Sequence, residues 1–337
     1  MQTTNSRPST APFDAPAQYK ERIELVEVIA RLEIMQGNGD TDLLRALDKP
    51  NSLMFSDRLA RRRSLWWSSP EQRPSAVQRG QKMAMIHGLM SAAATDASWR
   101  RGSHWQRRLL NKLNAREFAR RLNIPCPQLY WQRRYVSRGA LEELPGDFVL
   151  KPALGKRGRG VYVMAGDTEL MQGKPMTHAA LLTEIALSRG RFSPTPLLAE
   201  ERVLDETLPN ALPAEYRFYM FADTVGAIEV IERAGRVAGP TRRRFYRDDW
   251  TPCPHDMHEK CTAEAWMEPP GCLQEMIKCA QRLSLAFETF VRVDLYASAR
   301  GCLFGELSSM PHGGRRFTEE ADALFDALWQ DHFPGAV

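Results

Sequence analysis

Alternating hydrophobic and polar residues predict two adjacent strands between residues 290 and 308. Apolar positions 291, 293 and 295 alternate with Arg292, Asp294 and Tyr296, and a second alternating run covers 303–308. A period of two is typical of a half-buried strand. Gly301 lies between the runs, and glycine readily takes the positive φ of a tight turn. The pattern therefore predicts a hairpin with a three-residue loop centred on Arg300.

The register of this hairpin brings two acids together. With Arg300 at the centre, Asp294 faces Glu306, and Arg292 faces Ser308 on the same side. Opposed Cβ atoms lie about 4.5–5.5 Å apart, so the two carboxylates repel each other. A divalent cation between them removes the repulsion, and oxygen ligands on facing strands suit Mg²⁺. The alternative is an exposed hairpin whose acids face each other by accident.

The same periodicities predict a mixed α+β chain. Helical spacing of apolar residues predicts helices at 19–36, 40–47, 78–94, 109–122, 177–189, 273–287 and 319–329. Shorter apolar or alternating runs predict strands at 128–135, 148–151, 161–164, 197–201, 214–221 and 227–232. Residues 1–18 are rich in Pro, Ser, Thr and Ala, which predicts a disordered tail.

Composition indicates a chain without a membrane span. The 337 residues are 43% hydrophobic and 26% charged, and no apolar run reaches the roughly 18 residues of a transmembrane helix. The first residues lack the apolar core of a secretory signal. Six cysteines without a CxxC pair favour a reducing, cytoplasmic location.

The charge balance favours an anionic partner. The net charge is +5, and arginines recur as pairs or triplets. A nucleotide, a nucleic acid or an acidic polymer would suit this balance. Solvated helix faces are the alternative explanation for most of the pairs. No sequence pattern typical of RNA or DNA readout is present.

A glycine-rich basic loop joins the strands predicted at 148–151 and 161–164. It contains Gly155, Gly158 and Gly160. Backbone N–H groups of such a loop can surround phosphate oxygens. The loop is not a Walker loop, because Lys156 precedes Arg157 rather than Ser or Thr and no helix follows. An ordinary surface turn is the alternative.

Cys253, His255, His258 and Cys261 lie within nine residues of each other. Cysteine and histidine side chains are the usual zinc ligands. Their spacing is too compressed for a standard zinc finger, so we expect no zinc site here.

The order of these parts resembles the ATP-grasp superfamily, and the C-terminal two thirds are similar to its TupA-like family. The superfamily likeness lies in Lys112, Lys151, the glycine loop, Glu200, Glu201, Arg217, Asp294 and Glu306. The closer likeness lies in the stretches 215–221, 244–250, 290–296 and 304–314. Two features depart from the family pattern. The loop at 152–160 replaces the family's Cys-Asn-His-Gly-Ser-Gly type stretch, and Ser308 stands where most ATP-grasp enzymes have a metal-binding Asn.

The resemblance implies an ATP-grasp fold in which two α+β subdomains clamp ATP. They would cover residues 108–202 and 203–337, after a mostly helical region at 19–107. It implies that nucleotide-binding groups are Lys112, Lys151, Gly155, Gly158, Gly160, Glu200 and Glu201. Arg217 and Arg292 would act on the transferred phosphoryl group, and Asp294, Glu306 and Ser308 would hold Mg²⁺.

The implied activity is ATP-dependent ligation of a carboxylate to an amine through an acyl phosphate, as ATP-grasp ligases perform it. The TupA-like family is associated with surface polysaccharide or peptide polymers. Two alternatives stay open at this stage. The same clamp serves kinases that do not ligate, and a basic chain with an inactive fold could bind polyanions without catalysis.

Overall fold

The computed structural model describes residues 55–56, 58–59, 84–101, 105–155, 158–189, 195–205, 211–233, 241–261, 267–314 and 316–333. The predicted tail at 1–18 and the predicted helices at 19–36 and 40–47 lie outside these residues. Of the helix predicted at 78–94, only residues 84–87 are described as helical. They are followed by α5 (Asp96–Trp99) and a 3-10 turn, η1 (Trp105–Leu110).

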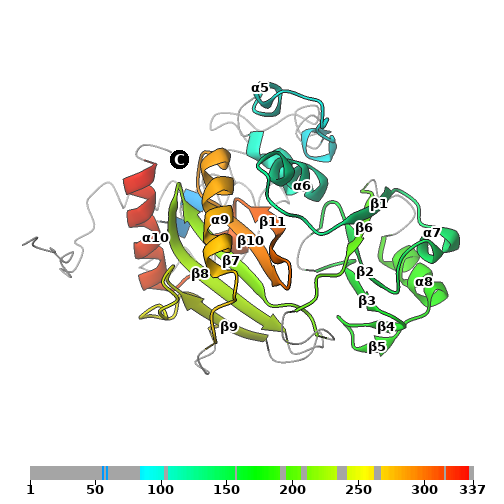
Figure 1. The fold of residues 1–337 in the computed structure, drawn as a ribbon. Coiled ribbons are helices and arrows are strands. Elements are labelled where there is room, and N and C mark those ends of the chain that lie inside the picture. Colours follow the sequence, from blue (N-terminus) through cyan, green and yellow to red (C-terminus); the bar gives the residue numbers. More distant parts are fainter. Residues whose placement is uncertain are drawn as a thin grey trace, which may run out of the picture. The chain divides into compact units, whose positions relative to one another are not determined.

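Two antiparallel sheets organise the described chain, which confirms the α+β fold class (Figure 1). The first sheet has the order β1-β6-β2-β3-β4-β5. Its strands are β1 (Leu129–Arg133), β2 (Asp147–Pro152), β3 (Tyr162–Ala165), β4 (Thr168–Glu169), β5 (Lys174–Pro175) and β6 (Leu197–Glu201). Helices α7 (Arg138–Glu142) and α8 (His178–Arg189) pack on it through Leu141, Leu181 and Ile185.

The second sheet has the order β11-β10-β7-β8-β9. Its strands are β7 (Glu215–Phe221), β8 (Thr224–Arg233), β9 (Thr241–Tyr246), β10 (Val291–Ser298) and β11 (Gly301–Ser308). Both sheets lie within the unit formed by residues 54–337. The predicted subdomain boundary at residue 202 stays a prediction.

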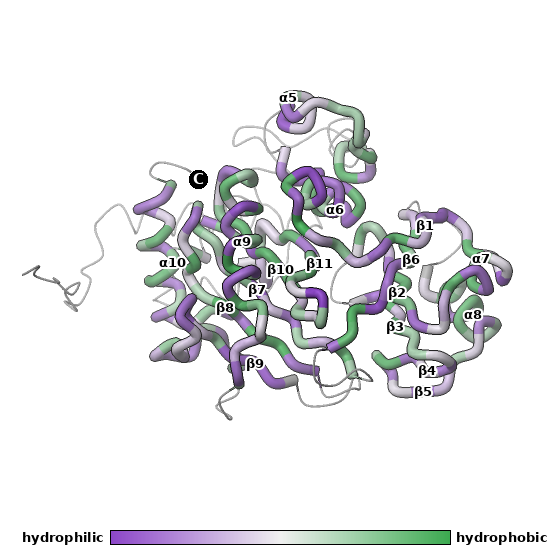
Figure 2. Tube along the Cα trace, in the orientation of Figure 1, coloured by the Kyte–Doolittle hydropathy of each residue, from purple (hydrophilic) through white to green (hydrophobic). Residues whose placement is uncertain are grey.

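Helices cover both faces of the second sheet. Alternate strand residues point in opposite directions, so each face carries apolar side chains against which a helix packs. Phe218 and Met220 share a core with α9 (Leu273–Phe287), whereas Tyr219 and Phe221 share one with α10 (Glu319–His332). Figure 2 shows the matching alternation of hydrophilic and hydrophobic residues along α9. Strand β10 is therefore buried on both faces. The prediction that it is half-buried is wrong, and its polar face lies inside the protein.

The helix predicted from residue 109 begins later, at Lys112, as α6 (Lys112–Arg121). Asn111 caps it, since its side chain accepts a hydrogen bond from the Leu113 amide. Residues 109 and 110 belong instead to η1. The buried residues Leu109 and Phe118 of this region pack in the core of the second sheet.

The β10–β11 hairpin keeps the predicted pairing at its far end but not at its turn. Asp294 lies opposite Glu306, and Arg292 lies opposite Ser308. Near the turn, Ser298 pairs with Gly301, which makes a two-residue loop instead of the predicted three-residue loop. An irregularity at Gly305 restores the register, because Leu295 pairs with Phe304 while Asp294 pairs with Glu306. Among the described helices, none is long and apolar enough to cross a membrane.

Candidate active site

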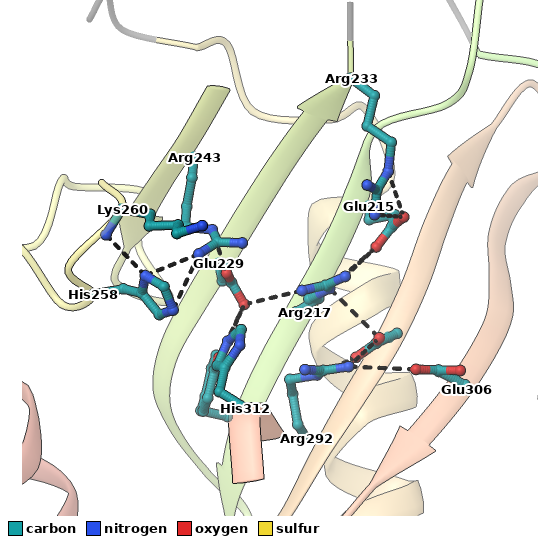
Figure 3. A network of polar contacts seen from close by, with 12 residues as sticks. Glu215, Arg217, Glu229, Arg233, Arg243, His258, Lys260, Arg292, Glu306 and His312 are labelled. Atoms are coloured by element: carbon teal, nitrogen blue, oxygen red, sulfur yellow. Dashed lines mark hydrogen bonds and ion pairs between the residues drawn. The ribbon is translucent and has the colours of Figure 1, made fainter. Parts of the chain in front are cut away.

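A buried carboxylate and an accessible one form the centre of the candidate site. Asp294 is only 5% exposed, whereas the Glu306 side chain is 42% exposed. Arg292 grips Asp294 with two hydrogen bonds of 2.6 Å and reaches Glu306 Oε1 at 3.4 Å (Figure 3). Burial raises the pKa of Asp294 to about 6, and the negative charge of Glu306 adds to the effect, although Arg292 and Arg217 oppose it. The two arginines therefore do not fully compensate for the burial of the Asp294 carboxylate.

Arg217 joins this pair to a second acidic cluster. It lies opposite Asp294 on the neighbouring strand β7, and its Nε is 3.5 Å from Asp294 Oδ2. Its Nη2 is 2.5 Å from Glu215 Oε2, and its Nη1 is 3.6 Å from Glu229 Oε2. Although burial opposes the charge, these three carboxylates raise the pKa of Arg217 well above its ordinary value. Arg217 is thus a permanently charged group fixed beside Asp294.

Lys112 connects the hairpin with the start of the glycine loop. Its Nζ lies 3.8 Å from Glu306 Oε2 and 3.5 Å from the carbonyl oxygen of Gly155. Its backbone N–H donates to the carbonyl oxygen of Ala153 at 2.9 Å. Burial lowers the pKa of Lys112, and Glu306 counteracts that effect. The ammonium group of Lys112 therefore lies close both to the start of the glycine loop and to Glu306 of the Asp294–Glu306 pair.

Lys151 and Glu200 form an ion pair between the adjacent strands β2 and β6. Their side chains are 15% and 10% exposed. Arg116 Nη1 also lies 3.9 Å from Glu200 Oε2. Lys151, which lies between apolar residues of its strand, is thus paired with Glu200 in this structure.

Glu201 lies next to Glu200 but binds different groups. Its Oε1 is 2.5 Å from Arg300 Nη2 in the β10–β11 turn, and its Oε2 accepts a hydrogen bond from the Gln128 amide at 2.9 Å. The strand end that carries both predicted glutamates is therefore tied to the turn of the hairpin.

The described part of the glycine loop has the backbone shape that glycine allows. Gly158 and Gly160 have φ values of 69° and 70°. A Cβ on Gly155 would lie 2.8 Å from the Pro152 ring. Lys156 and Arg157 lie outside the described residues. These glycines are required by the loop's conformation, whichever group the loop binds.

The chemistry of Asp294 and Glu306 fits a magnesium ion. Both supply hard oxygen atoms, and burial raises the pKa of Asp294, an effect that a further cation would oppose. Within the described ranges, no three His, Cys, Asp or Glu side chains gather as a metal site. The pair would therefore depend on nucleotide phosphates and water for the remaining ligands. Ser308 lies one pair further along the hairpin, opposite Arg292.

The Cys253–Cys261 segment lies entirely within the described residues. His258 is 1% exposed and within 2.9 Å of Arg243 Nη1, whereas His255 is exposed. Burial, together with the charges of His312 and Arg243, lowers the pKa of His258 to about 3. The absence of zinc stays a prediction. All six cysteines are free.

Sequence reasoning did not single out a second polar group behind Arg217. Glu229 is completely buried in β8 and accepts a 2.9 Å hydrogen bond from the Tyr219 hydroxyl. His312 Nε2 lies 3.2 Å from that hydroxyl and 3.7 Å from Glu229 Oε2 (Figure 3). One signal was present in the sequence, because Glu229 is a single charge within the apolar run 227–231.

Comparison with known proteins gives one family and several distant structures. A family model described as "TupA-like ATPgrasp" matches residues 102–333. No curated protein sequence matches the chain. D-alanine–D-alanine ligase from Bacillus anthracis complexed with ATP is 12% identical, with a TM-score of 0.39, over 66% of this chain and 64% of the ligase. This chain thus spans slightly less than two thirds of that ligase.

Two further solved structures have similar scores. A RimK domain ATP-grasp protein from Sphaerobacter thermophilus is 14% identical over 68% of this chain and 69% of its own, with a TM-score of 0.40. The ATP-grasp ligase PsnB, complexed with minimal precursor, Mg and ADP, is 16% identical over 65% and 57%, with a TM-score of 0.37. Likenesses at this level carry no argument about activity or substrate.

Proposed function

Because this chain belongs to the TupA-like ATP-grasp family, we propose that it is an ATP- and Mg²⁺-dependent carboxylate–amine ligase that acts through an acyl phosphate. The observation that carries the proposal is the paired carboxylates Asp294 and Glu306, with Arg292 and Arg217 at their side and Lys112 Nζ 3.8 Å from Glu306. Such a set of charges suits the polyphosphate of a nucleotide and its metal ion.

The nucleotide would lie between the groups that the first sheet and the hairpin present. Lys112 and Lys151 would neutralise phosphate charge. Backbone N–H groups of the loop at Gly155, Gly158 and Gly160 would surround the phosphates. Glu200 and Glu201, at the end of β6, would hold the adenosine.

Asp294 and Glu306, with Ser308 beside them, would hold Mg²⁺, which when bound spreads the charge of the phosphates. Arg292 and Arg217 are fixed by their carboxylate partners and would stabilise charge on the phosphoryl group during transfer. A substrate carboxylate oxygen attacks the γ-phosphorus and ADP leaves. An amine then attacks the carbonyl carbon, and phosphate leaves. No protein nucleophile is required.

We propose further that the acceptor is a cell-surface polysaccharide or peptide polymer and that the ligation uses cytoplasmic ATP, because the TupA-like family is associated with such polymers. The free cysteines are compatible with a reducing compartment. We include the acceptor class and the cytoplasmic location in the proposal.

Hydroxylamine tests the proposal, because it converts an acyl phosphate to a stable hydroxamate. The full chain is incubated with MgATP, hydroxylamine and a panel of sugar acids, dicarboxylates and amino acids. We expect acid-dependent ADP release and hydroxamate with at least one acid. Asp294→Asn and Glu306→Gln should each lower this turnover by about 10³-fold or more, since the ion contributes several kcal/mol.

Glu232→Gln is the matched control, because Glu232 pairs with Arg242 away from the site at 2.7 Å. It should leave turnover unchanged. ADP release with a stable phosphate ester and no hydroxamate would identify a kinase instead. Failure to use ATP with any acid would overturn the proposal.

A further inference from the structure

His312 lies in a backbone segment of unusual conformation directly after the hairpin. His312, Gly313 and Gly314 have successive φ values of 55°, 70° and 77°. A histidine in this left-handed region costs about 1 kcal/mol or more, and such positions concentrate at functional sites. The His312 side chain is 15% exposed. The segment thus fixes an imidazole that is mostly buried but still reaches the surface.

Hydrogen bonding decides which ring nitrogen carries the proton. Although burial opposes its charge, His312, Arg217 and Arg243 hold the pKa of Glu229 well below its usual range, so Glu229 is an acceptor. Burial and Glu229 raise the pKa of Tyr219, so the phenol keeps its proton. The Tyr219 hydroxyl donates that proton to Glu229 at 2.9 Å. It can therefore only accept from His312 Nε2, 3.2 Å away.

This arrangement leaves Nδ1 of His312 as a lone-pair acceptor. Within the residues that the structure describes, Nδ1 makes no hydrogen bond. A buried carboxylate behind one nitrogen stabilises the imidazolium that forms when the other nitrogen accepts a proton. The geometry is that of a general base with an orienting acid.

His312 is also next to the groups proposed to act on phosphate. Glu229 Oε2 lies 3.7 Å from His312 Nε2 and 3.6 Å from Arg217 Nη1. Arg217 Nε in turn lies 3.5 Å from Asp294 Oδ2. Figure 3 shows this continuous chain from His312 to Glu306. One carboxylate therefore separates the imidazole from the arginine at the proposed phosphoryl site.

We propose that Nδ1 of His312 accepts the proton of the amine that attacks the acyl phosphate. This inference rests on the ligase function proposed above. The amine lone pair forms the C–N bond, and the C–O bond to phosphate breaks with its electron pair on the leaving oxygen. The amine proton moves to Nδ1, and the imidazolium then returns it to the departing phosphate. Glu229 and Tyr219 hold the ring and balance its charge.

The neighbours of His312 set the pH dependence. Among the residues that the structure describes, the charged or titratable groups facing it are Glu229 on β8, Tyr219 and Arg217 on β7, Arg292 on β10, and His258 in the loop after β9. Burial lowers the pKa of His312, and Glu229 partly counteracts this effect. At a fixed concentration of free-base amine, amide formation should rise with pH through a pKa below the ordinary histidine value and be level at neutral pH.

The ring tautomer can be measured without any substrate. NMR of the full chain with labelled histidine reports which nitrogen is protonated, and His312→Asn identifies the resonance. Asparagine tolerates positive φ, so this variant should fold. We expect the Nε2–H tautomer at neutral pH. An Nδ1–H tautomer, or a charged ring at neutral pH, would overturn the proposal whatever the reaction is.

Comparison of two nucleophiles tests the proton transfer itself. Hydroxylamine is a weak base that is neutral at pH 7, and its adduct readily loses a proton to water, so hydroxamate forms without a general base. An alkylamine such as glycine is mostly an ammonium ion. It first loses one proton to solvent to become the attacking amine, and the more tightly held proton of its adduct then needs Nδ1 as acceptor. With an acid that the wild type activates, His312→Asn should lower amide formation by about 10²–10⁴-fold and leave hydroxamate formation unchanged.

His255→Asn is the matched control, since His255 is an exposed histidine in the loop after β9. It should change neither product. Equal loss of both products in His312→Asn would mean a structural role, and retention of both would mean no role; either result overturns the proposal. If the wild type forms no hydroxamate with any acid, the ligase function fails, and the proton-acceptor role that rests on it fails as well.

Discussion

Replacing Lys151 with alanine should remove most of the stabilisation that a nucleotide gives this protein. Lys151 is largely buried, and Glu200 is its partner. If the lysine also contacts a phosphate, the alanine variant loses one charge-assisted contact, worth about 1.5–3 kcal/mol. That loss corresponds to roughly a 10- to 100-fold weaker Kd.

The expected shift in melting temperature follows from mass action. A non-hydrolysable ATP analogue with Mg²⁺ at about 100 times Kd stabilises the wild type by about 2.7 kcal/mol. After a 30-fold loss of affinity, the same concentration gives about 0.9 kcal/mol. At about 2 °C per kcal/mol for a chain of this size, the shift falls from roughly 5 °C to under 2 °C.

Each variant must be compared with its own nucleotide-free melt. Without Lys151, Glu200 retains only Arg116, at 3.9 Å, among its described ion-pair partners, so the nucleotide-free protein should also be less stable. Lys174→Ala is the control. Lys174 makes a 2.5 Å ion pair with Glu184 at the edge strand of the same sheet. That variant should keep the full nucleotide shift. If Lys151→Ala also keeps it, Lys151 does not bind the nucleotide and its role is the ion pair alone.

Two further predictions concern the fold. Gly305→Ala places a Cβ 2.8 Å from the backbone oxygen of Asp294, so it should lower the unfolding free energy measured in urea by about 1–3 kcal/mol and abolish turnover. Gly139→Ala is the control, because its Cβ would meet nothing within 4 Å, and it should be neutral or stabilising. Equal changes of unfolding free energy in the two variants would refute the explanation. Phe55 is fully buried against five aromatic rings, including Phe325 and Trp329, so Phe55→Ala should cost about 3–5 kcal/mol; a loss below about 1 kcal/mol would show that Phe55 does not pack there.

The sequence predicted the limits of helix α9, which buries one face alone, and of strand β6, which is buried on both faces. Strand β6 and helix α9 have the predicted bounds of 197–201 and 273–287. In α9, the buried residues Leu273, Met276, Ala280, Leu283 and Phe287 recur at helical spacing. A single apolar stripe determines both the type and the limits of such an element.

The polar interior was much harder to predict. The alternation in β10 indicates a solvated face, and the helices on both sides of the sheet cannot be inferred from one strand. That face is buried because Arg292, Asp294 and Arg217 satisfy one another. Partners of this kind come from other strands, so His312, Glu229 and Tyr219 could not be grouped before the register of β7, β8 and β10 was known.

The facing acids illustrate how a correct pairing can follow from incomplete reasoning. A three-residue loop without a bulge would pair Asp294 with Glu306. The protein instead has a two-residue loop, which on its own would place Asp294 opposite Gly305. The extra residue at Gly305 shifts the register by one and returns Glu306 to Asp294. Without the bulge, every β11 side chain beyond Gly305 would change faces. The proximity of the two carboxylates therefore depends on a glycine that carries no functional group, because only a residue without a Cβ fits against the Asp294 backbone.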